Sequence, residues 1–185
     1  TELTDVMRFS RGKDAEQAEA SLKIRHGDTT AVEFYQRREW LTGGTRDAMI
    51  TAAVDAYLAD VERGLSSVVV ASTNADVDTM NEMIRHARIS AGEVDTTTEA
   101  RLSRGDKAGL GDTIVARLNQ STERGRVMNG QLFTVVGITE DGSLDVREQK
   151  TGAYMRLEAD YVQEHTHLGY ALTVHRAQGA TVDTT

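Results

Sequence analysis

The sequence predicts an α/β fold into which a small antiparallel barrel or meander is inserted. Three observations lead to this prediction: helical periodicity beside a β-branched run in the first hundred residues, alternating apolar runs between residues 111 and 162, and a further apolar strand at residues 169–174. The 185 residues, of which 39% are hydrophobic, are enough for one ordinary domain or two small ones.

The first part of the chain predicts three helices. Residues 14–25 have a helix-forming composition, and the cluster Gly27-Asp28-Thr29-Thr30 ends this helix and caps a short one through Phe34 and Tyr35. Residues 40–44 then form a turn. A longer helix is expected from Thr45 to Gly64, with one apolar stripe made of Met49, Ala52, Ala53, Ala56, Tyr57 and Val61.

A strand, a polar turn and a helix follow. Residues 65–71 (LSSVVVA) are suited to a strand buried on both faces of a parallel sheet. Ser72-Thr73-Asn74 forms a loop and a helix cap, and the next helix is marked by Val77, Met80, Ile84 and Ala87. The polar turn therefore lies at the carboxyl end of a strand, where α/β sheets place their ligands.

The pattern alternates after residue 111. Runs at 113–118, 131–136, 143–147 and 154–157 are separated by the turn dipeptides Asn129-Gly130, Asp141-Gly142 and Thr151-Gly152. Four or five such strands form a small barrel or meander. Because an α/β-type strand reappears at residues 169–174, this part is expected to be an insertion.

Composition narrows the function classes. The absence of cysteine excludes a disulfide scaffold, a thiolate metal site and a cysteine nucleophile. No apolar run reaches the ~20 residues of a membrane helix and the first residues lack the apolar stretch of a signal peptide, so a cytoplasmic protein without a membrane partner is expected. No phosphate-loop, dinucleotide-binding or nucleophile-elbow motif is present, and the five histidines are not spaced for a metal.

Charge is unevenly distributed. The net charge is −8, yet residues 101–130 carry six basic and three acidic side chains, while residues 47–82 carry seven acidic and one basic. These stretches are either solvated surfaces of opposite sign, or the basic one contacts phosphate.

Residues 168–183 (LGYALTVHRAQGATVD) form the most specific motif. They predict a buried strand that delivers a hydroxyl, an imidazole, a guanidinium and a carboxamide to one edge of a sheet, followed by a glycine. Taken alone, these residues are better explained by a strand end with a capping threonine and a hydrogen-bonded histidine. The run closely resembles motif V of RecD-like superfamily 1 DNA helicases, GYA-x-T-x-H-x-x-QG-x-T.

Three further stretches resemble the same family in the same order. Residues 3–9 (LTDVMRF) resemble motif IV, and residues 68–74 (VVVASTN), with Asn81 beyond them, resemble the motif that follows it. Residues 111–138 resemble the SH3-like 2B insertion. The resemblance covers nearly the whole chain and is greatest for the helicase region of MobF-type conjugative relaxases, with the RecD exonuclease subunit (exonuclease V alpha-subunit type) as a close relative.

The resemblance implies an architecture. A RecA-like 2A domain with a parallel sheet would span residues 1–100 and 163–185, and an SH3-like 2B barrel would span residues 101–162. The Walker motifs of domain 1A would lie before Thr1 and motif VI after Thr185, so the chain would be a fragment of an ATP-dependent DNA helicase or translocase, inactive alone. Its partners would be single-stranded DNA and the missing 1A domain.

The resemblance also implies residue roles. Arg8 would stabilise charge on the γ-phosphate of ATP. Phosphates of the DNA strand would be contacted by Thr73, Asn74, Thr173, His175 and Arg176. Gln178, Gly179 and Thr181 would couple the DNA and nucleotide sites, although UvrD-type helicases have a ribose-contacting glutamate at the place of Thr181.

Cofactors and an alternative function complete the expectations. ATP and Mg²⁺ would act in the full-length enzyme, with no metal or cofactor bound by this chain alone. The alternative is a non-catalytic protein-interaction module, a small β-barrel on an α/β platform. The acidic net charge favours the module, whereas the basic bias of residues 101–130 favours DNA binding.

Overall fold

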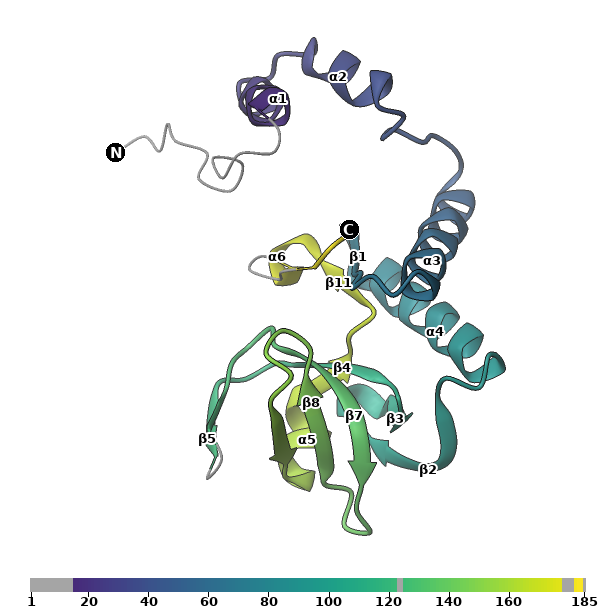
Figure 1. Ribbon diagram of the computed structural model, residues 1–185, viewed down its shortest axis with the longest axis vertical. Coiled ribbons are helices and arrows are strands. Elements are labelled where there is room, and N and C mark those ends of the chain that lie inside the picture. Colours follow the sequence, from purple (N-terminus) through teal and green to yellow (C-terminus); the bar gives the residue numbers. More distant parts are fainter. Residues whose placement is uncertain (1–14, 123–124, 178–181, 185) are drawn as a thin grey trace. The chain divides into compact units, whose positions relative to one another are not determined.

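The computed structural model describes residues 15–122, 125–177 and 182–184. The chain forms two compact units, residues 1–49 and 50–185. It contains both helices and short sheets (Figure 1), so the mixed α/β class predicted from the sequence is confirmed. No helix in these described ranges is both long and apolar enough to cross a membrane.

The first unit contains helices α1 (Ala15–Arg25) and α2 (Ala31–Arg37), where the sequence predicts them. Ala20, Ala31 and Phe34 form a small core. In the intervening turn, Asp28 accepts hydrogen bonds from the backbone N and Oγ1 of Thr30 at 2.9 and 2.7 Å. The polar cluster between the helices therefore closes the turn through side-chain bonds.

Helix α3 (Arg46–Glu62) forms as predicted, but its buried stripe differs from the prediction. Ile50, Val54 and Tyr57 are buried, whereas Ala52 and Ala56 are exposed. The bulkier side chains at i, i+4 and i+7 remove more apolar area from water than the alanines do, so they decide which face of the helix packs inward.

Strand β1 (Val69–Ala71) pairs in parallel with β11 (Ala171–Thr173). Within the described residues this sheet has two strands, so the wider parallel sheet of a RecA-like domain is not observed there. Val70 is 36% exposed, which corrects the expectation of a strand buried on both faces, because successive side chains of a strand point to opposite faces and only the face of Val69 is buried. Helix α4 (Asn74–Ser90) follows β1, and α6 (Val174–Ala177) follows β11.

The segment between α4 and β11 is mostly antiparallel. Strand β2 (Asp95–Arg101) pairs with β3 (Lys107–Leu110) across the 3₁₀ turn η1 (Ser103–Gly105), and β5 (Gln120–Thr122) pairs with β6 (Gly125–Val127). Helix α5 (Ala159–His165) precedes the last strand of a five-stranded sheet. That sheet has the order β10-β4-β7-β8-β9, with β4 (Thr113–Ala116), β7 (Leu132–Ile138), β8 (Leu144–Glu148), β9 (Tyr154–Leu157) and β10 (Thr166–Leu168).

The predicted antiparallel meander is confirmed. Strands β4, β7, β8 and β9 pair in antiparallel succession, and Gly130, Gly142 and Gly152 have positive φ at the predicted turns. No pairing among the described residues joins β9 to β10, so a closed SH3-like barrel is not observed. The ranges 1–100, 101–162 and 163–185 stay predictions, and β10, beyond residue 162, pairs with β4.

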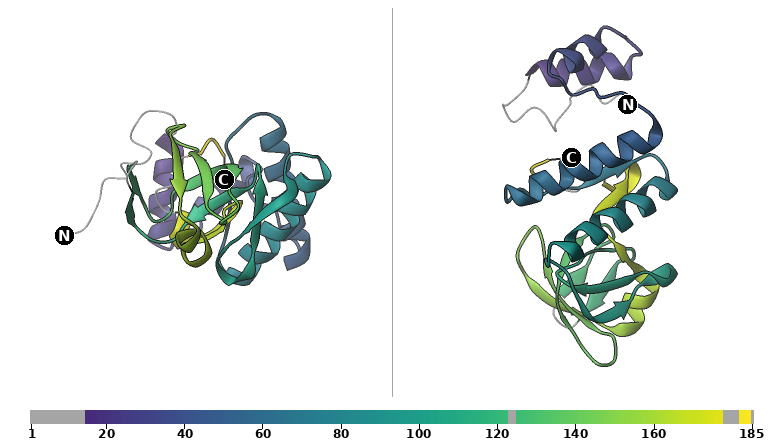
Figure 2. Two further views of the ribbon diagram at one scale, coloured as in Figure 1. Left: turned by 90° about the horizontal axis from the view of Figure 1, so that it is seen from below. Right: turned by 90° about the vertical axis from the view of Figure 1, so that its right-hand side faces the viewer.

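Apolar packing joins the two kinds of sheet. Val68, Val115 and Leu172 form one buried cluster, which brings β1 and β11 against β4. Figure 1 and the right view of Figure 2 show β1, β11 and α4 at one end of the second unit, and the antiparallel strands with α5 at the other. Near the chain end, Asp183 accepts hydrogen bonds from the backbone N and Oγ of Ser66, so this segment lies beside the start of β1.

Candidate nucleic-acid interface

The parallel pairing of β1 and β11 gathers predicted contact residues at one edge. Ala71 lies opposite Thr173, so the segments that follow the two strands leave the sheet at its carboxyl edge. Thr73 and Asn74 are exposed there, Thr173 is half-buried, and His175 is exposed on α6. Carboxyl edges of parallel strands are where α/β folds bind ligands.

Thr73 is the N-cap of α4. Its Oγ1 accepts a hydrogen bond from the backbone N of Asp76 at 3.1 Å and donates one to Asp76 Oδ2 at 2.6 Å. A phosphate oxygen only accepts hydrogen bonds, so the Thr73 hydroxyl can donate to DNA only if its hydrogen bond to Asp76 breaks. The predicted cap is confirmed, and the predicted DNA contact of Thr73 stays a prediction.

Asn81 on α4 fixes the position of β11. Its Nδ2 donates to the carbonyl of Ala171 at 3.3 Å, and its Oδ1 accepts from the backbone N of Ala171 at 2.9 Å. On the side of β1, the backbone N of Val69 donates to the carbonyl of Tyr170 at 3.0 Å. The amide of Asn81 thus pairs with both backbone groups of Ala171, as a neighbouring β-strand would, and it holds the start of β11 against α4.

A buried polar network holds Tyr170, just before β11. The Tyr170 hydroxyl donates to Asp112 Oδ1 at 2.5 Å, and Asp112 Oδ2 accepts from Arg85 Nε at 2.9 Å and from the backbone N of Gly109 at 2.7 Å. Arg85 also pairs with Glu99 at 2.6 Å. Burial raises the pKa of the Tyr170 hydroxyl, and the charge of Asp112 raises it further, so the hydroxyl keeps its proton and donates.

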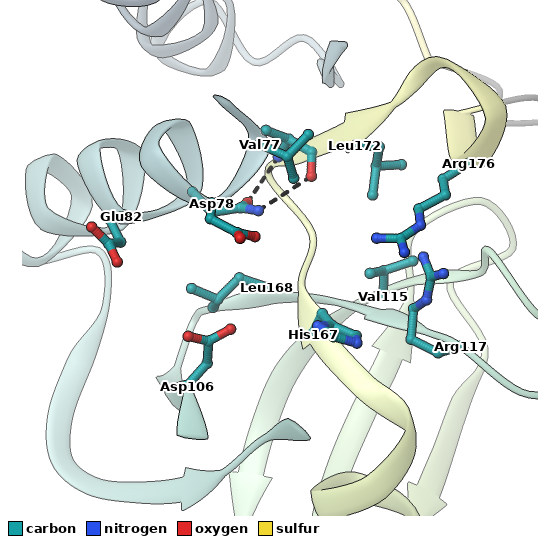
Figure 3. A pocket seen from close by; sticks show the side chains of 12 residues that line it. Val77, Asp78, Glu82, Asp106, Val115, Arg117, His167, Leu168, Leu172 and Arg176 are labelled. Carbon is teal, nitrogen blue, oxygen red and sulfur yellow. Dashed lines mark hydrogen bonds between the residues drawn. The ribbon is translucent and has the colours of Figure 1, made fainter. Parts of the chain in front are cut away.

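A small pocket lies beside this edge, lined from α4, β4, β10, β11 and α6. Its volume of about 30 Å³ holds one or two water molecules and is far too small for a nucleotide. Figure 3 shows the carboxylates of Asp78, Glu82 and Asp106 toward one side of the pocket, and the guanidinium groups of Arg117 and Arg176 at the other.

Positive charge is concentrated on the arginine side. Burial lowers the pKa of Arg117, and the charges of Arg176 and Arg104 lower it further. Burial, with the charges of the same three arginines, lowers the pKa of His167 to about 4, so its imidazole is neutral at pH 7. Within the described ranges, none of the three arginines forms an ion pair with a carboxylate.

The predicted and observed site residues overlap in part. Arg8, Gln178, Gly179 and Thr181 lie outside the described residues, and Arg176 lines the pocket. Sequence reasoning missed Arg117 and His167 as site residues, although Arg117 directly follows a β-branched strand within the basic stretch 101–130. No group of His, Asp and Glu side chains among the described residues could hold a metal ion.

A curated protein of conjugal transfer is similar to this chain over most of its length. No family model matches. Over 94% of its length, the chain is 26% identical to a probable conjugal transfer protein TraA of Sinorhizobium fredii (strain NBRC 101917 / NGR234). This chain is similar to a conjugal transfer protein. It spans 16% of the length of that relative.

Other similarities are shorter or weaker. Two uncharacterized proteins of Mycobacterium tuberculosis, from strains CDC 1551 / Oshkosh and ATCC 25618 / H37Rv, are each 38% identical over 60 residues, which is 32% of this chain and 34% of theirs. A solved structure is also similar, with a TM-score of 0.49 and 18% identity, over 94% of this chain and 40% of the chain in that structure. It describes DNA unwinding at forked double-stranded DNA by two coordinating Pif1 helicases. That TM-score is too low to assign the fold.

Proposed function

We propose that this chain is part of an ATP-dependent DNA helicase or translocase of conjugative DNA transfer, and that it contributes contacts to the backbone of single-stranded DNA. The observation that carries the proposal is the register of β1 and β11, with Ala71 opposite Thr173, which puts Thr173 and His175 at one carboxyl edge with the start of α4. The motif at residues 168–183 and the similarity to TraA favour the same process.

The contacts at this edge suit a motor that moves along DNA of any sequence. The hydroxyl of Thr173 and the imidazole of His175 donate hydrogen bonds to phosphate oxygens, and such contacts carry no information about the bases. The bonds from Asn81 to Ala171 hold the edge against α4. A strand bound there is positioned by its backbone and can pass without regard to sequence.

The nucleotide part of the proposal rests on the motif resemblance alone. In the described residues, no carboxylate cluster could hold Mg²⁺, and the pocket beside the edge cannot hold a nucleotide. Arg8, which the resemblance assigns to the γ-phosphate, lies outside the described residues. ATP, when bound in the whole enzyme, would supply the phosphoryl-transfer energy for movement.

Binding of labelled single-stranded DNA to the 185-residue chain tests the proposal. At low salt, fluorescence anisotropy should give equal dissociation constants for poly-dT and a mixed sequence, within the non-specific range of about 10⁻⁴ to 10⁻⁶ M. The double variant Thr173→Ala/His175→Ala should weaken both complexes equally. The matched control Thr98→Ala/His86→Ala, at exposed positions of β2 and α4, should bind as the unaltered chain does.

Two results would contradict the proposal. The first is the absence of binding at millimolar protein, and the second is binding that the Thr173→Ala/His175→Ala variant leaves unchanged. Either result would favour the protein-interaction module that the sequence also allows.

A further inference from the structure

Arg117 and Arg176 reach the same place from different parts of the chain. Arg117 directly follows β4, and its backbone N donates to the carbonyl of His165 at 2.7 Å. Arg176 belongs to α6, whose neighbouring residue Ala177 packs against the buried cluster of Val68, Val115 and Leu172. Both guanidinium groups are therefore carried on anchored backbone (Figure 3).

The mutual repulsion of these positive charges destabilises the folded state. Arg117 and Arg176 are half-buried, and the charges of Arg176 and Arg104 disfavour the charged form of Arg117. Among the described residues, no carboxylate lies at ion-pair distance from Arg104, Arg117 or Arg176. Like charges held together without a carboxylate at ion-pair distance do not stabilise a fold, but they suit an anion, and guanidinium groups match the geometry of phosphate oxygens.

We propose that Arg117 and Arg176 together bind one phosphate group of a single-stranded DNA backbone, with Arg104 strengthening the local positive potential. This inference rests on the proposed function and adds a specific phosphate site to it. Arg176 lies next to His175 on α6, so one strand can contact the carboxyl edge and the arginine pair in succession. The bound phosphate would bridge α6 and the end of β4.

The shape and charge of the pocket restrict how the phosphate binds. At about 30 Å³ the pocket cannot enclose a phosphodiester, so the phosphate lies over its mouth at the arginine side. Asp78, Glu82 and Asp106 line the same pocket and repel the neighbouring phosphates. The strand is therefore expected to run along the arginine side and away from these three carboxylates.

Charge-neutralising variants of the 185-residue chain test the site. Arg117→Gln and Arg176→Gln should each weaken binding of labelled poly-dT about 10- to 100-fold at low salt, as expected for one charge-assisted contact. The double variant Arg117→Gln/Arg176→Gln should also make the dependence of log K on log salt shallower by about 0.7, the loss of one phosphate contact on a single strand. Arg147→Gln, at an exposed position of β8, has the same change in net charge and should leave both quantities unaltered.

A second measurement separates binding from folding. Because Arg117 and Arg176 repel each other, either glutamine variant should keep or raise the melting temperature of the free chain while it binds DNA less tightly. A fall in the melting temperature, with DNA affinity lowered in proportion, would assign the arginines a structural role and overturn the phosphate site.

The remaining outcomes distinguish the two proposals. If the chain binds DNA and Arg117→Gln behaves as Arg147→Gln does, the phosphate site is wrong and the proposed function stands. If the chain does not bind DNA, both proposals are wrong. In that case, a rise in melting temperature with inorganic pyrophosphate that Arg117→Gln abolishes would assign the arginine pair to a free phosphate compound instead.

Discussion

Replacement of Asn81 by leucine should destabilise the second unit strongly. Leucine has nearly the same size but cannot bond to the backbone of Ala171, whose N–H and C=O are held by the Asn81 amide at 2.9 and 3.3 Å. Asn81 is 6% exposed and Ala171 is 0% exposed, so water cannot replace these bonds without opening the structure.

The size of this destabilisation follows from the N–H and C=O groups of Ala171, which both lose their hydrogen-bond partner. A buried donor or acceptor left without a partner costs about 1–3 kcal/mol, so Asn81→Leu should lower the free energy of unfolding by about 2–6 kcal/mol. That is a large part of the roughly 5–15 kcal/mol that stabilises a typical domain. The control His86→Ala, at an exposed position of the same helix, should change the stability by less than about 0.5 kcal/mol.

Urea unfolding followed by circular dichroism measures the difference. The single tryptophan, Trp40, belongs to the first unit, so its fluorescence does not report on β11. Hydrogen exchange at residues 169–174 locates the effect, because the Ala171 amide should lose its protection first. An Asn81→Leu midpoint equal to that of His86→Ala, with this amide still protected, would refute the role assigned to Asn81.

Three further predictions concern the same region. Asp112→Asn puts an amide NH₂ among the donors of Tyr170, Arg85 and Gly109 at a fully buried position, although Arg85 keeps its pair with Glu99, and it should cost about 1–3 kcal/mol in urea unfolding. Glu93→Gln, which removes a partly exposed ion pair, should cost no more than about 1 kcal/mol. Gly169→Ala puts a Cβ 2.9 Å from a backbone carbon of β4, so a thermal melt should show a loss of about 1–3 kcal/mol. Burial and the charges of Arg104, Arg117 and Arg176, opposed by Asp78, lower the pKa of His167 to about 4 in the folded chain against 6.5 unfolded, so the unfolded state binds the proton first. Stability should therefore fall as pH drops from 6.5 to 4, and His167→Gln should flatten that part of a pH series of urea midpoints, a result that an unchanged slope would contradict.

Local patterns determined the secondary structure of this protein. The period-two runs that end in Asn-Gly, Asp-Gly and Thr-Gly specify antiparallel strands, because glycine tolerates the positive φ that these turns require. The Thr73 cap and the apolar spacing of residues 77–87 specify α4 in the same way. Both signals are carried by neighbours in the chain, so the sequence is enough to find them.

The tertiary structure decided which residues share a site. Periodicity does not encode which apolar surfaces meet. That decides which face of α3 is buried and, among the described residues, why the parallel sheet has two strands and the meander stays open. The same holds for the bonds from Asn81 to Ala171 and for Arg117 beside Arg176. These pairs are far apart in the sequence and come together because Val68, Val115 and Leu172 pack β1 and β11 against β4, since burial of apolar surface has no fixed spacing along the chain.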